Sequence, residues 1–337
     1  MTLRRSWAAA ASLAMAATLL LPACNRRKPA EVNPISPSLS VNRERAPLGS
    51  AIEIQYTWAV EPAAKPLGQD YRAFVQFRDT HGVILFQDDH MPVPPPTQWE
   101  EGKTYTYKRT KFIPIYPYVG EVEVRMGLYP HPGRGERPVL KGEDRGLREY
   151  RVAKMELLPQ TENIFLVYKD GWHNPETHPE DPSLERTWTK KEGLVSFKNP
   201  KRDVVVYLEA DTCVTCYEQT PVLSLSIGRA GVTIPIERPE VFLKKIRVKA
   251  DDLGSDEWVD MRFSMNQSFV PKLMNPPMND DDRELGLLVY HLYVGEADRV
   301  GALEGASVMD AGPAVPAPAA ASPDKAPGAK AAAGARK

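Results

Sequence analysis

The feature that most restricts the fold of this chain is a strict alternation of apolar and polar residues. In the stretch IEIQYTW, positions 52, 54, 56 and 58 are apolar and the positions between them are polar, and positions 71–77 repeat the pattern. A period of two residues places successive side chains on opposite faces of a β-strand. The pattern therefore predicts strands with one buried face.

Proline makes up 32 of the 337 residues. This frequency counts against long helices, because proline has no backbone N–H and its ring clashes with the preceding turn. The stretch FRDTHGVILF predicts a hairpin with its turn at 79–82, and further strands are expected at KTYTYKRTKF and EVEVRMGLY. We therefore predict a first antiparallel β-sandwich over residues 39–153.

A second series of strand patterns follows. The candidates are VVVYL, VLSLSIG, VTIPI, FLKKIRV, WVDMRFSM and LGLLVYHLYV, with a hairpin turn expected at 229–231. About 260 residues of patterned sequence exceed what one core usually needs. The chain is therefore predicted to be all-β, with a second sandwich over residues 155–296.

The N-terminal residues have the composition of an export signal. Arg4 and Arg5 precede an apolar stretch over 7–21, which is too short and too rich in alanine for a secure membrane span. Small residues then precede Cys24. We expect residues 1–23 to be a signal peptide that is removed.

The run LPAC at 21–24 resembles the lipobox of bacterial lipoproteins. The resemblance implies that Cys24 is acylated, for example with palmitate, and anchors the protein to a membrane of the bacterial cell envelope. By the sorting rule of enteric bacteria, Asn25 after the cysteine favours the outer membrane. The alternative is an ordinary secretory signal with a cysteine near the cleavage site.

Segments without a core pattern flank the two domains. Residues 24–38 are predicted to be a polar tether, and the Ala/Pro/Lys-rich residues 300–337 a disordered tail. Removing residues 1–23 takes away two arginines and no acid, so the formal net charge of -1 becomes about -3. A nucleic-acid partner is therefore not expected. No sequence motif for a cofactor or for a common catalytic mechanism occurs.

Cys213 and Cys216 lie three residues apart in EADTCVTCYEQ. In an exported protein a disulfide is the favoured state. Because a disulfide needs Cα atoms within about 7 Å, the two residues between the cysteines must form a turn. The alternatives are a redox-active pair, or part of a zinc site completed by His173 and His178.

The acidic run NDDDRELG at 279–286 contains one arginine. We expect Arg283 to form a structural ion pair with Asp281 that fixes the loop before the last strand. The alternatives are a cation site over residues 280–282 and catalysis by two carboxylates. Catalysis would need acids from distant segments, such as Glu176 and Asp281, to converge in a cleft.

Four aromatic residues are candidates for stacking on sugar rings. Tyr116 and Tyr118 lie between prolines in IPIYPYVG, and this segment is expected at the surface. Trp172 and Trp188 are the other two candidates. The alternative for each of them is a place in the core.

Together these segments resemble two Ig-like sandwich modules that accompany the glycan machinery of bacterial envelopes. The first pattern is carried by Asp79, Gly82, Asp88, Pro92, Trp99, Gly102, Gly120, Gly127, Tyr129, Gly135 and Arg137. The second is carried by Gly171, Trp172, Glu176, Trp188, Phe269, Pro271, Asp281, Arg283, Leu285, Gly286 and Val289. The second departs from the usual form where Thr187 separates Arg186 from Trp188. The resemblance implies two tandem Ig-like β-sandwiches near surface-polysaccharide assembly or export.

The sequence therefore favours a non-enzymatic envelope lipoprotein that binds or scaffolds a polysaccharide or an envelope protein. One alternative is a carbohydrate-active hydrolase with a cleft between the sandwiches. Another is a periplasmic thiol or metal-binding protein that uses Cys213 and Cys216.

Overall fold

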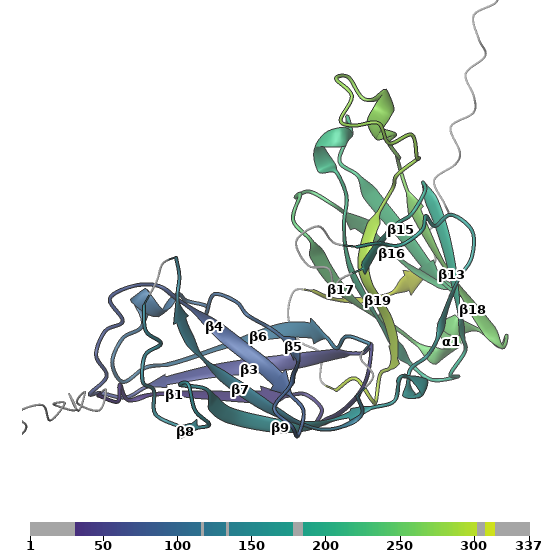
Figure 1. The fold of residues 1–337 in the computed structure, drawn as a ribbon. Coiled ribbons are helices and arrows are strands. Elements are labelled where there is room, and N and C mark those ends of the chain that lie inside the picture. Colours follow the sequence, from purple (N-terminus) through teal and green to yellow (C-terminus); the bar gives the residue numbers. More distant parts are fainter. Residues whose placement is uncertain (1–30, 116–117, 133–134, 178–184, 302–306, 314–337) are drawn as a thin grey trace, which may run out of the picture.

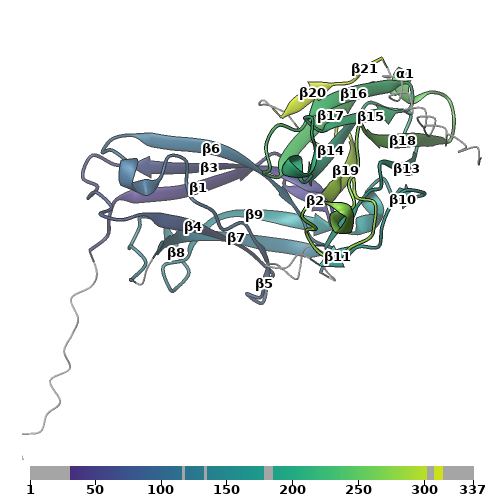
Figure 2. The same cartoon turned by 90° about the horizontal axis from the view of Figure 1, so that it is seen from above.

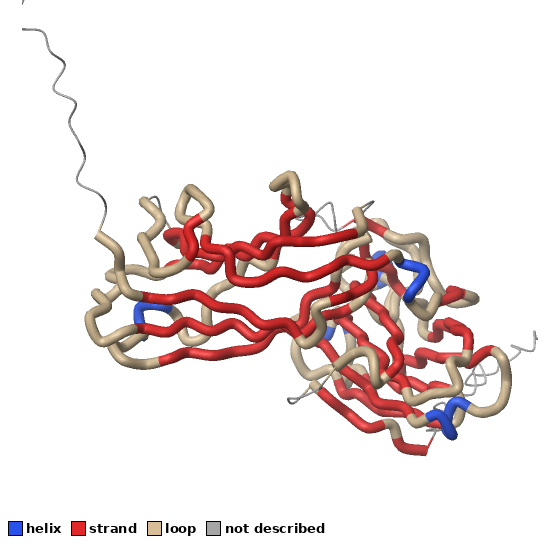
Figure 3. Tube along the Cα trace, turned by 90° about the horizontal axis from the view of Figure 1, so that it is seen from below, coloured by secondary structure: helices blue, strands red, loops and turns tan. Residues whose placement is uncertain are grey.

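Two β-sandwiches follow one another along the chain and meet at an angle (Figure 1). The computed structural model describes residues 31–115, 118–132, 135–177, 185–301 and 307–313. Nearly all regular structure is strand (Figure 3). The helical segments are α1 (Ala250–Leu253), η1 (Pro96–Gln98), η2 (Gln160–Glu162), η3 (Val214–Cys216) and η4 (Pro271–Leu273). The predicted all-β class with two tandem antiparallel Ig-like sandwiches is confirmed.

Nine strands of the first sandwich lie in the described residues. They are β1 (Ile35–Val41), β2 (Arg45–Pro47), β3 (Ala51–Val60), β4 (Tyr71–Arg78), β5 (Ile84–Gln87), β6 (Thr104–Phe112), β7 (Gly120–Pro130), β8 (Glu143–Asp144) and β9 (Tyr150–Leu158). One sheet has the order β1-β3-β6, and the other has the order β2-β9-β7-β4-β5 with β8 beside β9. The two sheets are seen as separate layers in Figure 2. All pairs are antiparallel except β2 with β9.

The first core forms between the inward faces of these two sheets. Ile54, Tyr56 and Trp58 of β3 are fully buried, as are Val75 and Phe77 of β4. These are apolar positions of the alternating pattern. The predicted direction of these side chains is confirmed.

The predicted hairpin between β4 and β5 is also confirmed. The Asp79 carboxylate accepts hydrogen bonds from the backbone N–H groups of His81 and Val83, each at 2.8 Å. Gly82 takes a positive φ of 84°, which glycine adopts without a steric cost. The turn residues therefore act as their sequence indicates.

In the second sandwich, the described ranges contain twelve strands. They are β10 (Leu166–Tyr168), β11 (Glu176–Thr177), β12 (Glu185–Trp188), β13 (Glu192–Lys198), β14 (Val204–Asp211), β15 (Val222–Ile227), β16 (Ala230–Pro235), β17 (Phe242–Val248), β18 (Trp258–Met265), β19 (Leu288–Glu296), β20 (Val308–Asp310) and β21 (Gly312–Pro313). One sheet has the order β10-β13-β18-β15-β16-β21 and the other β11-β12-β19-β14-β17-β20. The expected hairpin turn at 229–231 lies earlier, at Gly228 and Arg229, because Ala230 already pairs with Ile227.

The domain boundaries differ from those expected. Residues 35–38 belong to β1 rather than to a tether, since β1 pairs with β3 from Ile35 onwards. The first domain extends past residue 153, because β9 stays paired with β7 as far as Leu157. The second domain extends past residue 296 to residue 313.

Residues 307–313 close the second sandwich although they fall in the expected tail. Strand β20 pairs with β17 in one sheet, and β21 pairs with β16 in the other. Met309 and Ala311 pack against the second core. The burial of these two apolar side chains and the two short strand pairings therefore stabilise this part of the segment. The remainder of the expected tail, 314–337, lies outside the described residues.

A third apolar cluster joins the two sandwiches. Ala51 and Phe112 of the first domain pack against Val205, Tyr207 and Tyr293 of the second. Val300, which follows β19, is also fully buried in this cluster. We call this contact region the domain joint. It removes the facing ends of β3, β6, β14 and β19 from water.

Polar contacts add to the domain joint. Lys245 on β17 forms an ion pair with Glu53 on β3 at 2.7 Å, and only 4% and 12% of these side chains are exposed. The Phe112 ring stacks on the imidazole of His291, with ring centroids 4.2 Å apart. A buried ion pair of this kind favours one relative placement of the domains, because a shift that parts the charges while the joint stays closed leaves each charge buried without its partner.

Candidate functional site

Strand β18 presents alternating faces to the core and to the outside of the second sandwich. Val259, Met261 and Phe263 are buried in the core. Trp258 and Asp260 therefore point outward, as expected from the period of two. The outward side chains of β18 lie beside those of its neighbour β13.

The pairing register extends this outward surface to the edge strand. Trp258 lies opposite Lys198 of β13. One row further along, Asp260 lies opposite Ser196, and Ser196 lies opposite Val167 of β10. Phe165, just before β10, continues the alternation on the same side, because its neighbours Ile164 and Leu166 pack against the core.

We call this surface the aromatic face. It consists of Phe165, Val167, Lys169, Ser196, Lys198, Trp258, Asp260 and Arg262. Its three large apolar side chains, Phe165, Val167 and Trp258, are 52%, 43% and 47% exposed. By the pairing register, Lys198 lies between Phe165 and Trp258, so the face alternates exposed aromatic and polar side chains.

Polar side chains of the aromatic face are held in place by one another. Asp260 accepts a hydrogen bond from the Ser196 hydroxyl and binds the Lys169 ammonium at 3.1 Å. The hydrogen bond from Ser196 and the charge of Lys169 lower the pKa of Asp260. This carboxylate is therefore ionised at neutral pH and acts as a hydrogen-bond acceptor.

The remaining charges of the aromatic face are loosely paired at the surface. Lys198 lies 4.0 Å from Glu257, and Arg262 lies 3.6 Å from Glu192. Exposed pairs of this kind contribute little to stability, so their donors can turn to a ligand at low cost. Flat aromatic rings beside hydrogen-bonding groups suit a ligand with an apolar face and hydroxyl groups, such as a sugar ring.

The aromatic residues proposed from the sequence as sugar-stacking candidates do not belong to the aromatic face. Trp172 packs edge-on against Phe263, with ring centroids 5.3 Å apart, and its Nε1 donates to the Leu194 carbonyl. Trp188 packs edge-on against Phe269. The partly buried Tyr118 donates its hydroxyl hydrogen to the Glu121 carbonyl. Tyr116 lies outside the described residues, so its stacking role stays a prediction.

Trp258 and Phe165 were missed by the analysis of the sequence. The signal for Trp258 is present in WVDMRFSM, where the alternation sets Trp258, Asp260 and Arg262 against the apolar residues between them. Phe165 carries no comparable signal, because its neighbours IFLVY form a continuous apolar run. Its outward direction depends on how β10 pairs with β13.

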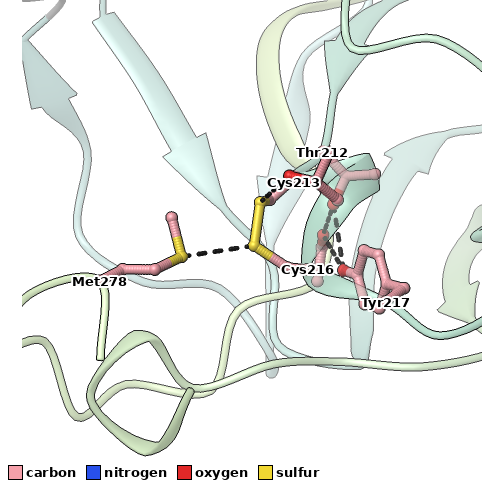
Figure 4. The surroundings of a disulfide bond; sticks show 7 residues. Thr212, Cys213, Cys216, Tyr217 and Met278 are labelled. Carbon is pink, nitrogen blue, oxygen red and sulfur yellow. Dashed lines mark hydrogen bonds between the residues drawn. A yellow bond between two sulfur atoms is a disulfide. The ribbon is translucent and has the colours of Figure 1, made fainter. Parts of the chain in front are cut away.

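The predicted disulfide between Cys213 and Cys216 is confirmed, with Cα atoms 5.3 Å apart. The intervening residues form the 3-10 turn η3, and the backbone N–H of Cys216 bonds to the carbonyl of Cys213. The sulfur of Met278, from the loop before β19, lies 3.4 Å from the sulfur of Cys216 (Figure 4). The disulfide thus closes a turn within one loop and contacts a second loop at the same end of the second sandwich.

Arg283 binds two carboxylates that come from distant segments. Its guanidinium bonds to Asp281 at 2.6 Å and to Glu176 at 2.7 Å. The hydrogen bond from Arg283 lowers the pKa of Asp281. Glu176 and Asp281 therefore converge on one cation, whose single positive charge balances one of their two negative charges. General acid catalysis needs a carboxyl that stays protonated, and the lowered pKa of Asp281 opposes that role for this residue.

The proposed zinc ligands do not assemble where the structure can be followed. His173 bonds through Nε2 to the Glu284 carbonyl at 2.7 Å, and His178 lies outside the described residues. The described ranges contain no group of three His, Cys, Asp or Glu side chains placed to hold a metal ion. The Cys213–Cys216 disulfide also removes both thiolates that a zinc site would need.

Cys24 and the expected signal peptide lie outside the described residues. In the part of the chain that is described, no helix has the length and apolar character to cross a bilayer.

Two glycines of the sequence pattern have a steric role. A Cβ at Gly171 would lie 1.9 Å from the Glu192 carbonyl oxygen, and a Cβ at Gly286 would lie 2.3 Å from the Lys190 carbonyl oxygen. Gly171 also has a positive φ of 85°. These pattern residues therefore serve close backbone packing.

Comparison with known proteins gives distant matches in structure alone. No family model and no curated sequence matches the chain. One similar structure is the tandem CBM22-1–CBM22-2 domain of Paenibacillus barcinonensis Xyn10C, with 9% identity, a TM-score of 0.24, and coverage of 78% of this chain and 94% of that chain. Another is the M60 catalytic domain with CBM51-1 and CBM51-2 of Clostridium perfringens ZmpB, with 7% identity, a TM-score of 0.23, and coverage of 74% and 34%. TM-scores this low carry no argument about the ligand of this chain.

Proposed function

We propose that this chain is a non-enzymatic lipoprotein of the bacterial cell envelope that binds a polysaccharide through the aromatic face. The observation that carries the proposal is the exposure of Trp258 and Phe165 on one sheet face, with ordered polar groups between and beside them. Burying an exposed aromatic ring against a sugar is favourable, and the paired strand that carries Trp258 leaves only the side chain to be ordered on binding.

The lipid anchor in this proposal rests on the sequence around Cys24. The first described residues lie at the end of the first sandwich that is remote from the second (Figure 1). In the proposal, an acyl chain at Cys24 would attach the protein to the membrane through the residues that precede this end. Palmitate labelling of the wild type, and its loss in Cys24→Ser, is the expected result.

The binding proposal is tested by screening the purified mature protein against envelope polysaccharides. We expect saturable binding of at least one polysaccharide, and we expect Trp258→Ala to weaken it about tenfold, because an aromatic contact contributes about 1 kcal/mol or more. Leu273→Ala is the control, since Leu273 is an exposed apolar residue outside the aromatic face.

Uniform failure to bind any polysaccharide would contradict the proposal and favour an envelope protein as the partner. Hydrolysis of a bound polysaccharide by the wild type would contradict its non-enzymatic part. Equal losses in Trp258→Ala and Leu273→Ala would show that the aromatic face is not the binding surface.

A further inference from the structure

A pocket of about 280 Å³ lies at the domain joint, apart from the aromatic face. Three segments line it: β2 with the residues before it, the connection that follows β9, and the end of β19 with the residues after it. Its walls combine apolar side chains, such as Ile164 and Tyr293, with the arginines Arg43, Arg45 and Arg299. Pockets between domains that mix apolar walls with a few charged groups are typical ligand sites.

Of the three arginines that line the pocket, Arg43 is the one without a carboxylate partner in the described residues. Its guanidinium donates to the backbone carbonyls of Ala51 at 2.7 Å and Arg299 at 3.3 Å. Its Nε is buried without a hydrogen-bond partner. Within the described ranges, no carboxylate lies within ion-pair distance of Arg43. Because this Nε is closed to solvent, a ligand in the pocket would meet the outer nitrogens of Arg43, Nη1 and Nη2, each of which keeps one hydrogen beyond its carbonyl bond.

The other two arginines already have carboxylate partners. Arg45 pairs with Glu156 at 2.7 Å, and Arg299 pairs with Glu296 at 3.4 Å. Glu296 also binds Arg202. The unmatched positive charge of the pocket is therefore located at Arg43. A planar carboxylate fits a guanidinium better than a spherical ion does, because two parallel hydrogen bonds can form.

We propose that this pocket binds a small acidic ligand, a single sugar-sized ring that bears one carboxylate. The carboxylate would pair with Arg43, and the ring would lie against Ile164 and Tyr293. The volume lies just below the usual range of about 300–1,000 Å³ for small-molecule pockets, which favours one ring over an oligosaccharide. Residues from both domains line the pocket, so the ligand would contact both.

The experiment is calorimetric titration of the mature protein with glucuronate, with glucose and inorganic phosphate as comparison probes. We expect saturable binding of glucuronate and none of glucose, which has the same ring without the carboxylate. Arg43→Gln should weaken glucuronate binding at least about tenfold, as for other hydrogen bonds to charged groups. Arg238→Gln is the matched control, because Arg238 is an exposed arginine outside the pocket.

A second variant tests whether the charge of the pocket controls binding, and it changes an exposed residue rather than a buried one. Glu162 is exposed and lines the pocket, so Glu162→Gln removes a negative charge that would repel the ligand. We expect Glu162→Gln to tighten glucuronate binding several-fold. This measurement tests the proposal even if the Arg43→Gln protein does not fold.

Three outcomes would overturn the proposal. They are no saturable glucuronate binding, equal binding of glucose, and phosphate binding as tight as that of glucuronate. The pocket and the aromatic face share no residue, so Trp258→Ala should leave glucuronate binding unchanged. Failure of this inference and failure of the polysaccharide proposal are thereby distinguishable.

Discussion

At the scale of single residues, the first sandwich contains a buried polar network that connects its two sheets. The hydroxyl of Tyr56 donates to Asp88 at 2.8 Å, and Arg109 binds the same carboxylate at 2.9 Å. The Nδ1 of His90 lies 2.7 Å from the Asp88 carbonyl, and its Nε2 lies 2.8 Å from the Tyr107 hydroxyl. Every member of the network has a partner, which keeps the cost of burying it low.

This network predicts loss of stability in mild acid. Burial lowers the pKa of His90, so the folded state holds the imidazole neutral and opposes its protonation. Stability is then fully present above the unfolded pKa of about 6.5 and is lost as pH falls towards the folded pKa. We expect the free energy of unfolding in urea to fall as pH is lowered from 7 to 5. His90→Gln should flatten this slope.

The exposed His81 supplies the control, because its side chain is 84% exposed. An unchanged slope in His90→Gln, or an equal change in His81→Gln, would contradict the role of His90. Asp88 contributes at lower pH. Burial raises its pKa, but the hydrogen bonds and charge of Arg109 outweigh burial and lower it, so its contribution is lost only in stronger acid.

At the scale of elements, the Cys213–Cys216 disulfide restrains the loop between β14 and β15. A double change, Cys213→Ser with Cys216→Ser, should lower the free energy of unfolding by about 2 kcal/mol, as expected for closing a very short loop. Chemical denaturation measures this change. Polysaccharide binding should stay unchanged, because the aromatic face lies on other strands. Loss of binding with unchanged stability would instead favour a functional thiol pair.

The strands themselves were predictable from the sequence where one face is buried. The alternation at 52–58 identifies β3, and DTHG identifies the turn between β4 and β5. The ends of the domains were not predictable, because β9 continues its pairing beyond the expected boundary and β20 and β21 gain stability from partners far away in sequence. Composition alone cannot reveal such long-range pairing.

The candidate site was predictable only in part, for a similar physical reason. Alternation shows that Trp258 points away from the core residues Val259 and Met261, but not whether another element covers it. Trp172 and Trp188 lie beside turns, as surface residues often do, yet each packs against a phenylalanine. Exposure depends on how strands pair, which a local pattern does not contain.

At the scale of the whole molecule, the domain joint couples the two sandwiches. Lys245→Met should lower the free energy of unfolding by about 3 to 5 kcal/mol, because it leaves the Glu53 carboxylate buried without its partner. Calorimetry should then show the two domains melting more separately than in the wild type. Adding Glu53→Leu should recover most of the loss, since an apolar pair can replace a buried ion pair.

A Lys245→Met protein with unchanged stability would contradict a tight domain joint. So would a double variant that is no more stable than the single one. A rigid joint matters for function in the proposed account, because it holds the aromatic face in a fixed position relative to the first sandwich.

The most direct test of the central claim is hydroxyl-radical footprinting of the protein with and without a bound polysaccharide. The account predicts that ligand protects Trp258 and Phe165 from oxidation, while Trp172 and Trp188 are unchanged. Protection of Trp172 or Trp188 with no protection of Trp258 would contradict it.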